Sequence, residues 1–115
     1  MRIRATAAMA AVLLCAASAS SAQTAPPKPP IIYGQGVSSC GTWLAARGEL
    51  PRHLAQISWV LGWLSAAGHY SVTSDLRETD SDAVAAWVDK YCREHPLNDI
   101  SDAAASLVDE LSKPK

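Results

Sequence analysis

The side chains best suited to covalent chemistry in this 115-residue chain are its three cysteines, Cys15, Cys40 and Cys92. Cys15 lies in an apolar N-terminal stretch that we interpret below as a signal peptide, so it would leave with that segment. Cys40 and Cys92 would then be the two thiols of an exported chain, and thiols outside the cytoplasm usually pair. We expect a Cys40 to Cys92 disulfide, whose long loop would add roughly 4 kcal/mol of stability.

A catalytic role for Cys40 is not expected. Gln35-Gly36 followed by Cys40-Gly41-Thr42-Trp43 superficially resembles the segment around the nucleophile of papain-like proteases. Thr42 stands where such a protease has a second cysteine, and too little chain follows for the His and Asn partners. Paired carboxylates for glycoside hydrolysis are present, but so short a chain leaves little room for a substrate cleft. We therefore predict no catalytic residues and no enzyme.

Metal and cofactor sites are not expected either. The histidines, His53, His69 and His95, lack the paired spacing that presents two zinc ligands on one helix face. Cys92 and His95 could share a metal only with a reduced thiol and two further ligands. The acidic stretch Asp75, Glu78, Asp80 and Asp82 lacks the glycine and the closing glutamate of a calcium loop. We interpret it as a solvated, helix-capping segment.

The N-terminal residues indicate export. Arg2 and Arg4 precede a short apolar run around Val12, Leu13 and Leu14, and small residues follow at 20–22. This is the pattern of a secretory signal peptide, and the run is short of the roughly 20 residues that cross a bilayer as a helix. We expect residues 1–22 to be removed, with cleavage after Ala19 as the alternative. The exported chain would then contain no membrane span.

Charge argues against nucleic acid and anionic membranes as partners. The chain has 10 Lys and Arg against 11 Asp and Glu. Loss of Arg2 and Arg4 with the signal peptide would make it mildly acidic. No run of basic residues follows one helix face, so the electrostatic pattern of a nucleic-acid-binding protein is missing.

Two parts are expected after the signal peptide. Residues 23–37 are predicted to be a flexible arm, because Ala25-Pro26-Pro27-Lys28-Pro29-Pro30 favours extended polyproline geometry. Ile31, Ile32 and Tyr33 could dock onto the domain before Gly34 and Gly36 turn the chain. Residues 38–112 are predicted to form one helical domain.

Hydrophobic periodicity and capping residues predict four helices in that domain. The first is capped by Ser38 or Ser39 and ends near Arg47, and the second runs from Pro51 to about Gly68. A capping pair of Thr79 and Asp82 starts the third, which reaches about Cys92, and Asn98 or Asp99 starts the fourth. The second helix has an apolar face of Leu54, Ile57, Leu61 and Leu64, widened by Trp59, Val60 and Trp63. The predicted fold is all-α, a small orthogonal four-helix bundle with one disulfide.

Four tryptophans, Trp43, Trp59, Trp63 and Trp87, are many for so small a chain without phenylalanine. We expect most of these tryptophan side chains to fill the core. Two of them lie on the long second helix, where a partly exposed indole could anchor a protein partner. The candidate partner-binding residues are therefore Trp59, Trp63 and Tyr70.

Three motifs resemble small bacterial periplasmic proteins related to HdeA. They are Ser39-Cys40-Gly41-Thr42-Trp43-Leu44, Trp59-Val60-Leu61-Gly62-Trp63-Leu64-Ser65, and Trp87-Val88-Asp89-Lys90-Tyr91-Cys92 before His95-Pro96-Leu97. That group includes acid-stress chaperones and, similar in layout, immunity proteins that neutralise amidase toxins of type VI secretion. The resemblance implies a periplasmic, non-catalytic protein-binding domain. Its partners would be unfolded periplasmic clients or a secreted toxin, and a homodimer is a further expectation.

Overall fold

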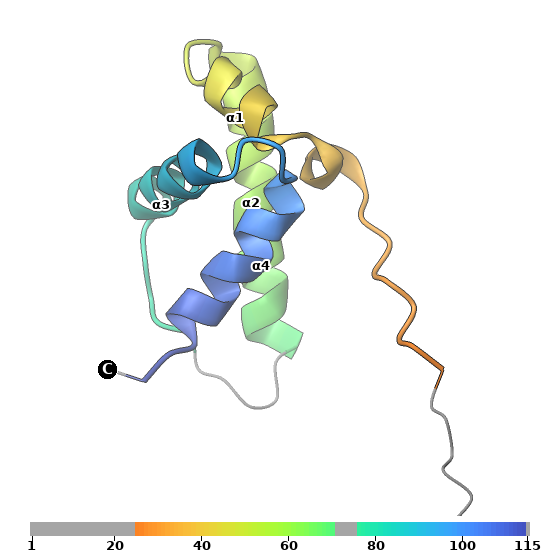
Figure 1. Ribbon diagram of the computed structural model, residues 1–115. Coiled ribbons are helices and arrows are strands. Elements are labelled where there is room, and N and C mark those ends of the chain that lie inside the picture. Colours follow the sequence, from red (N-terminus) through yellow and green to blue (C-terminus); the bar gives the residue numbers. More distant parts are fainter. Residues whose placement is uncertain (1–24, 71–75, 115) are drawn as a thin grey trace, which may run out of the picture.

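A computed structural model describes residues 25–70 and 76–114 of the chain. Its elements are the 3-10 turn η1 (Gly34–Val37) and the helices α1 (Cys40–Ala46), α2 (Leu50–Tyr70), α3 (Ser81–Glu94) and α4 (Ile100–Leu111). These residues contain no β-strand, which confirms the predicted all-α, four-helix fold (Figure 1). The expected signal peptide at 1–22 and Asp75 lie outside the described residues.

Short polar side chains stand at the start of α1, α3 and α4, where the backbone N–H groups of a first turn lack partners. The Ser39 hydroxyl accepts from Thr42 N at 3.2 Å, as predicted for α1. Asp80 caps α3 by accepting from Ala83 N at 2.8 Å, so the expected pairing of Thr79 with Asp82 is wrong. At α4 the side chain of Asp102 accepts from Asp99 N at 2.9 Å, which agrees with a start at Asp99.

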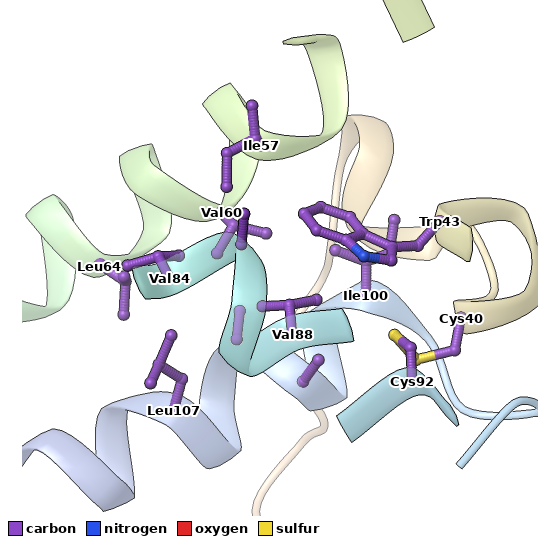
Figure 2. Packing of buried hydrophobic residues seen from close by; sticks show 13 residues of the cluster. Cys40, Trp43, Ile57, Val60, Leu64, Val84, Val88, Cys92, Ile100 and Leu107 are labelled. Atoms are coloured by element: carbon purple, nitrogen blue, oxygen red, sulfur yellow. A yellow bond between two sulfur atoms is a disulfide. The ribbon is translucent and has the colours of Figure 1, made fainter. Parts of the chain in front are cut away.

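The long helix α2 contacts each of the other three helices, and α4 lies along it (Figure 1). Inward-facing side chains of all four helices form one core (Figure 2). Trp43 is fully buried there, whereas Trp59, Trp63 and Trp87 pack against the edge of the core. Leu54 was expected on the buried face but is 51% exposed, because the first turns of α2 extend past the main core.

The disulfide Cys40–Cys92 is present, with its sulfurs fully buried between the start of α1 and the end of α3 (Figure 2). Three backbone hydrogen bonds surround it and tie the start of α1 to the connection between α3 and α4. Cys40 N donates to Asn98 O at 2.7 Å, Gly41 N to Pro96 O at 3.1 Å, and Ile100 N to Ser38 O at 2.8 Å. The disulfide and these three hydrogen bonds therefore lie together at this end of the bundle.

The proline-rich residues preceding η1 are extended and exposed, while η1 itself packs on α2 and α4. Of the three apolar residues expected to dock, Ile32 is half-buried, whereas Ile31 and Tyr33 are 63% and 76% exposed. Across the described residues, no helix combines the length and the apolar character that a membrane crossing needs.

Candidate functional site

A mainly apolar groove with a volume of about 380 Å³ lies between α2 and α4. Trp63, Ala66 and Ala67 line one side, and Ala105, Val108 and Asp109 line the other. Each set has the three-and-four spacing that places residues on one helix face. Alanines leave the space between the helices unfilled, and Asp109 puts one negative charge at the rim. We call this hollow the α2–α4 groove.

Trp59 and Trp63 lie one helical turn apart and stack on each other, with ring centroids 5.3 Å apart and planes inclined by 27°. Their surroundings differ. The Trp59 indole N–H donates to the carbonyl of Tyr33 at 2.8 Å, and Gly36 packs against the same ring. Trp59 is therefore covered by the chain's own N-terminal segment, while Trp63 lies at the open groove.

Tyr70, the third candidate partner-binding residue, lies apart from the two tryptophans. It ends α2 and is 77% exposed. Its ring meets the ring of His69 edge-on at 4.7 Å and does not line the groove. The structure thus brings Trp59 and Trp63 together and leaves Tyr70 near the end of the helix.

A polar cluster joins α1, α2 and α3 at the edge of the core. The indole N–H of buried Trp43 donates to Asp89 Oδ1 at 2.6 Å, and Arg47 Nε pairs with Asp89 Oδ2 at 3.2 Å. Arg47 Nη1 donates to His53 Nε2 at 2.5 Å, and the His53 ring meets Trp43 edge-on at 5.3 Å. A guanidinium can only donate, so this contact requires Nε2 of His53 to be unprotonated.

The environment of His53 favours its neutral form. Burial lowers the pKa of this imidazole below its ordinary value, and the positive charge of Arg47 lowers it further. The carboxylate of Asp89 acts in the opposite direction and only partly offsets them. Protonation of His53 would place a second positive charge against Arg47, so the cluster is sensitive to acid.

A second groove, of about 590 Å³, lies beside this cluster between α2 and α3. Arg47, His53, Ser81 and Asp82 supply its polar wall, and Ile57 and Leu61 supply apolar surface. One cation, Arg47, and one anion, Asp82, face the same space, so no one charge sign dominates it. This mixture suits contact with a polar protein surface better than retention of a small anion.

Metal-ligating side chains are dispersed. Among the described residues, no three His, Cys, Asp or Glu side chains are grouped to hold a metal ion. Cys92 is bonded to Cys40, and the ring of His95 packs on Tyr91 with centroids 4.6 Å apart. The local Cys92 and His95 arrangement considered above therefore has no free thiol.

Two features of this surface were not found from the sequence. The α4 half of the groove was missed, because Ala105 and Val108 look like ordinary residues of an amphipathic helix. The cluster of Arg47, His53 and Asp89 was missed as well, since Asp89 lies far from the other two in the chain and the three form no local motif.

Comparisons with protein-family models, with curated proteins and with solved structures find no match to this chain.

Proposed function

We propose that this chain is an exported, non-catalytic protein-binding domain that acts as a periplasmic acid-stress chaperone of the HdeA type. One observation carries the proposal: His53 lies against Arg47 where α1, α2 and α3 meet, so that its protonation would put two positive charges together, whereas the disulfide is unaffected by acid. Export is supported by the pattern of residues 1–22.

Asp89 is the central carboxylate, because it binds both Trp43 and Arg47 across the α1–α3 contact. Asp80 and Asp102 hold the first turns of α3 and α4. Protonation of His53 next to Arg47 adds repulsion at the same place. Protonation of His53 would therefore loosen the packing of α1 against α2 and α3.

Charge balance acts in the same direction over the whole chain. The 11 Asp and Glu residues lose their charge in acid, while Lys and Arg keep theirs and the three His gain one. The resulting mutual repulsion expands a small domain and exposes apolar surface. The disulfide would keep α1 joined to α3. Apolar faces around Ile57, Leu61 and Trp63 would become available to unfolded clients.

The test compares client protection at neutral pH and at about pH 2.5, below the ordinary titration range of carboxylates. Purified exported protein is mixed with an aggregating client, and light scattering and hydrophobic-dye fluorescence are recorded. We expect suppressed aggregation and dye binding in acid only. Absence of client protection in acid would refute the chaperone proposal.

A variant pair sharpens this experiment. Asp89→Asn keeps an acceptor for Trp43 but cannot pair with Arg47, so protection should begin at a higher pH than in the unaltered protein. Glu94→Gln is the matched control, since Glu94 is exposed on α3, the same helix as Asp89. If Asp89→Asn began to protect the client at the same pH as the unaltered protein, Asp89 would have no part in the acid response.

An immunity-type inhibitor of a secreted peptidoglycan amidase is the second candidate, and the corner between α1 and α2 favours it. Leu50 and Leu54 are 67% and 51% exposed there, beside the Arg52 to Glu49 ion pair at 3.4 Å. A helical corner with exposed leucines can enter the cleft of another protein without any acid switch.

The inhibitor proposal is tested at neutral pH. Tagged protein is used to capture envelope proteins, and binding to a secreted amidase is then measured. Tight binding that Leu54→Glu abolishes and Ala55→Glu preserves would support this role, because both residues are exposed on α2 and one alone is a large apolar residue. Failure to retain any envelope protein would contradict it.

A further inference from the structure

Gln56 of α2 is the one polar residue, among those that the structure describes, that is completely buried. Neither its Nε2 nor its Oε1 has a hydrogen-bond partner among these residues. A side-chain amide that leaves water without gaining such a partner keeps the full free-energy cost of its desolvation. The folded domain therefore contains an amide that would be more stable in contact with water.

Gln56 lies where α2 meets the N-terminal part of the domain. His53 precedes it by three residues and Trp59 follows it by three, so both flank it on the same side of the helix. His53 accepts from Arg47 at the end of α1, and Trp59 donates to the carbonyl of Tyr33 just before η1. Separation of α2 from α1 and η1 would therefore bring water to the amide of Gln56.

The other three helices are tied together more firmly than α2 is. The disulfide joins α1 to α3, and Trp43 of α1 donates to Asp89 of α3 at 2.6 Å. Backbone hydrogen bonds from Cys40 and Gly41 join α1 to the connection between α3 and α4. Within the described ranges, no hydrogen bond or ion pair joins α2 to α3 or α4, so apolar packing alone holds α2 against them.

We infer that the domain opens by separation of α2 from a unit of α1, α3 and α4, and that Gln56 makes this opening easier. Opening hydrates the amide of Gln56 and so releases the cost that it carries in the closed domain. The disulfide stays intact, because α2 lies wholly inside the loop that it closes. The inference concerns the domain by itself and does not depend on the chaperone or inhibitor role.

Amide hydrogen exchange of the oxidised protein at neutral pH tests which helix opens first. A separated helix of 21 residues is marginally stable in water, so α2 would lose its own hydrogen bonds when it leaves the core. After correction for intrinsic rates, the amides of Val60 and Leu64 in α2 should exchange at least about tenfold faster than those of Val88 and Cys92 in α3. Equal protection of the two helices would overturn the inference.

Variants of Gln56 test its part in the opening. Gln56→Met removes the amide at similar length and helix propensity, and should slow exchange in α2 by about fivefold or more. Gln56→Leu is the second variant, for the case in which methionine packs poorly. Gln56→Glu should act in the opposite direction, because it buries a charge. Ala55→Met, at an exposed position of the same helix, is the matched control and should change exchange less than about twofold.

Exchange in α2 that is unchanged or faster in both Gln56→Met and Gln56→Leu would overturn the role of Gln56. It would mean that the amide is satisfied in the closed domain, for example by a buried water molecule, and so contributes to holding α2 in place.

Discussion

At the scale of single residues, Asp89 is the most connected polar side chain of the core edge. Its two oxygens bind Trp43 Nε1 at 2.6 Å and Arg47 Nε at 3.2 Å. Asp89→Ala leaves the indole N–H of a fully buried tryptophan without its acceptor. We expect a loss of about 2 kcal/mol in the free energy of unfolding, within the range for a hydrogen bond to a charged group.

Urea denaturation at neutral pH measures this loss. Asp109→Ala is the control, because Asp109 is exposed and its removal should change the stability by less than about 0.5 kcal/mol. Equal effects of the two substitutions would contradict the structural role given to Asp89.

His53 makes stability depend on pH near neutrality. Its pKa is lowered in the folded state by burial and by Arg47, so the unfolded chain takes up the proton more readily. Stability should therefore fall as the pH drops from the ordinary value of 6.5 toward the lower pKa of the folded state, and this effect should level off below it. His53→Gln should remove this part of the pH dependence.

Denaturation midpoints measured between about pH 7 and pH 5 test the His53 prediction. His69→Gln, which alters an exposed histidine at the far end of α2, serves as the control and should keep the dependence. An unchanged pH profile in His53→Gln would show that Arg47 and His53 do not interact in solution.

At the scale of elements, the contact between η1 and α2 depends on the absence of a side chain at Gly36. A Cβ at this position would lie 2.5 Å from Trp59 Cη2 and 2.7 Å from Ile32 Cγ2. Gly36→Ala should therefore displace η1, break the Trp59 to Tyr33 hydrogen bond and cost about 1 to 3 kcal/mol, as overpacking usually does.

Tryptophan fluorescence and thermal unfolding test this prediction, with Trp59→Phe identifying the signal of that indole. Gly62→Ala is the matched control. Apart from the chain neighbours and the nearby backbone of α2 itself, no described atom lies within 4 Å of a Cβ at Gly62, so alanine there should stabilise the helix by about 0.5 to 1 kcal/mol. Similar effects at both glycines would argue against close packing of η1 on Trp59.

At the scale of the whole molecule, the disulfide joins positions separated by 52 residues and closes a loop that contains all of α2. Restricting so long a loop in the unfolded chain contributes about 4 kcal/mol in the chain-entropy model. This is a large share of the stability of a small domain. Reduction, or Cys40→Ser with Cys92→Ser, should lower the thermal midpoint sharply.

Unfolding of oxidised and reduced protein, with thiol labelling to verify each state, measures this contribution. If the thermal midpoint were the same with both thiols free, the core and the backbone hydrogen bonds from Cys40 and Gly41 would suffice to stabilise the fold without the disulfide.

The sequence by itself determined the four helices, most of their limits and the pairing of Cys40 with Cys92. Helix formation depends on hydrophobic spacing and on capping residues. Both involve residues only a few positions apart, so they can be read directly from the sequence. The closeness of Trp59 and Trp63 followed for the same reason, since they are four residues apart on one helix. The resemblance to HdeA-like proteins stays a proposal about function.

Only the tertiary structure decided which helix faces pack against each other and which stay exposed to solvent. Leu54 follows the apolar pattern of α2 yet is exposed, because local spacing does not say where the neighbouring helices end. The groove needs α4 against Trp63, and the acid-sensitive cluster needs Arg47, His53 and Asp89 together. Such contacts depend on how helices cross, which is set by packing of the whole core rather than by any one segment.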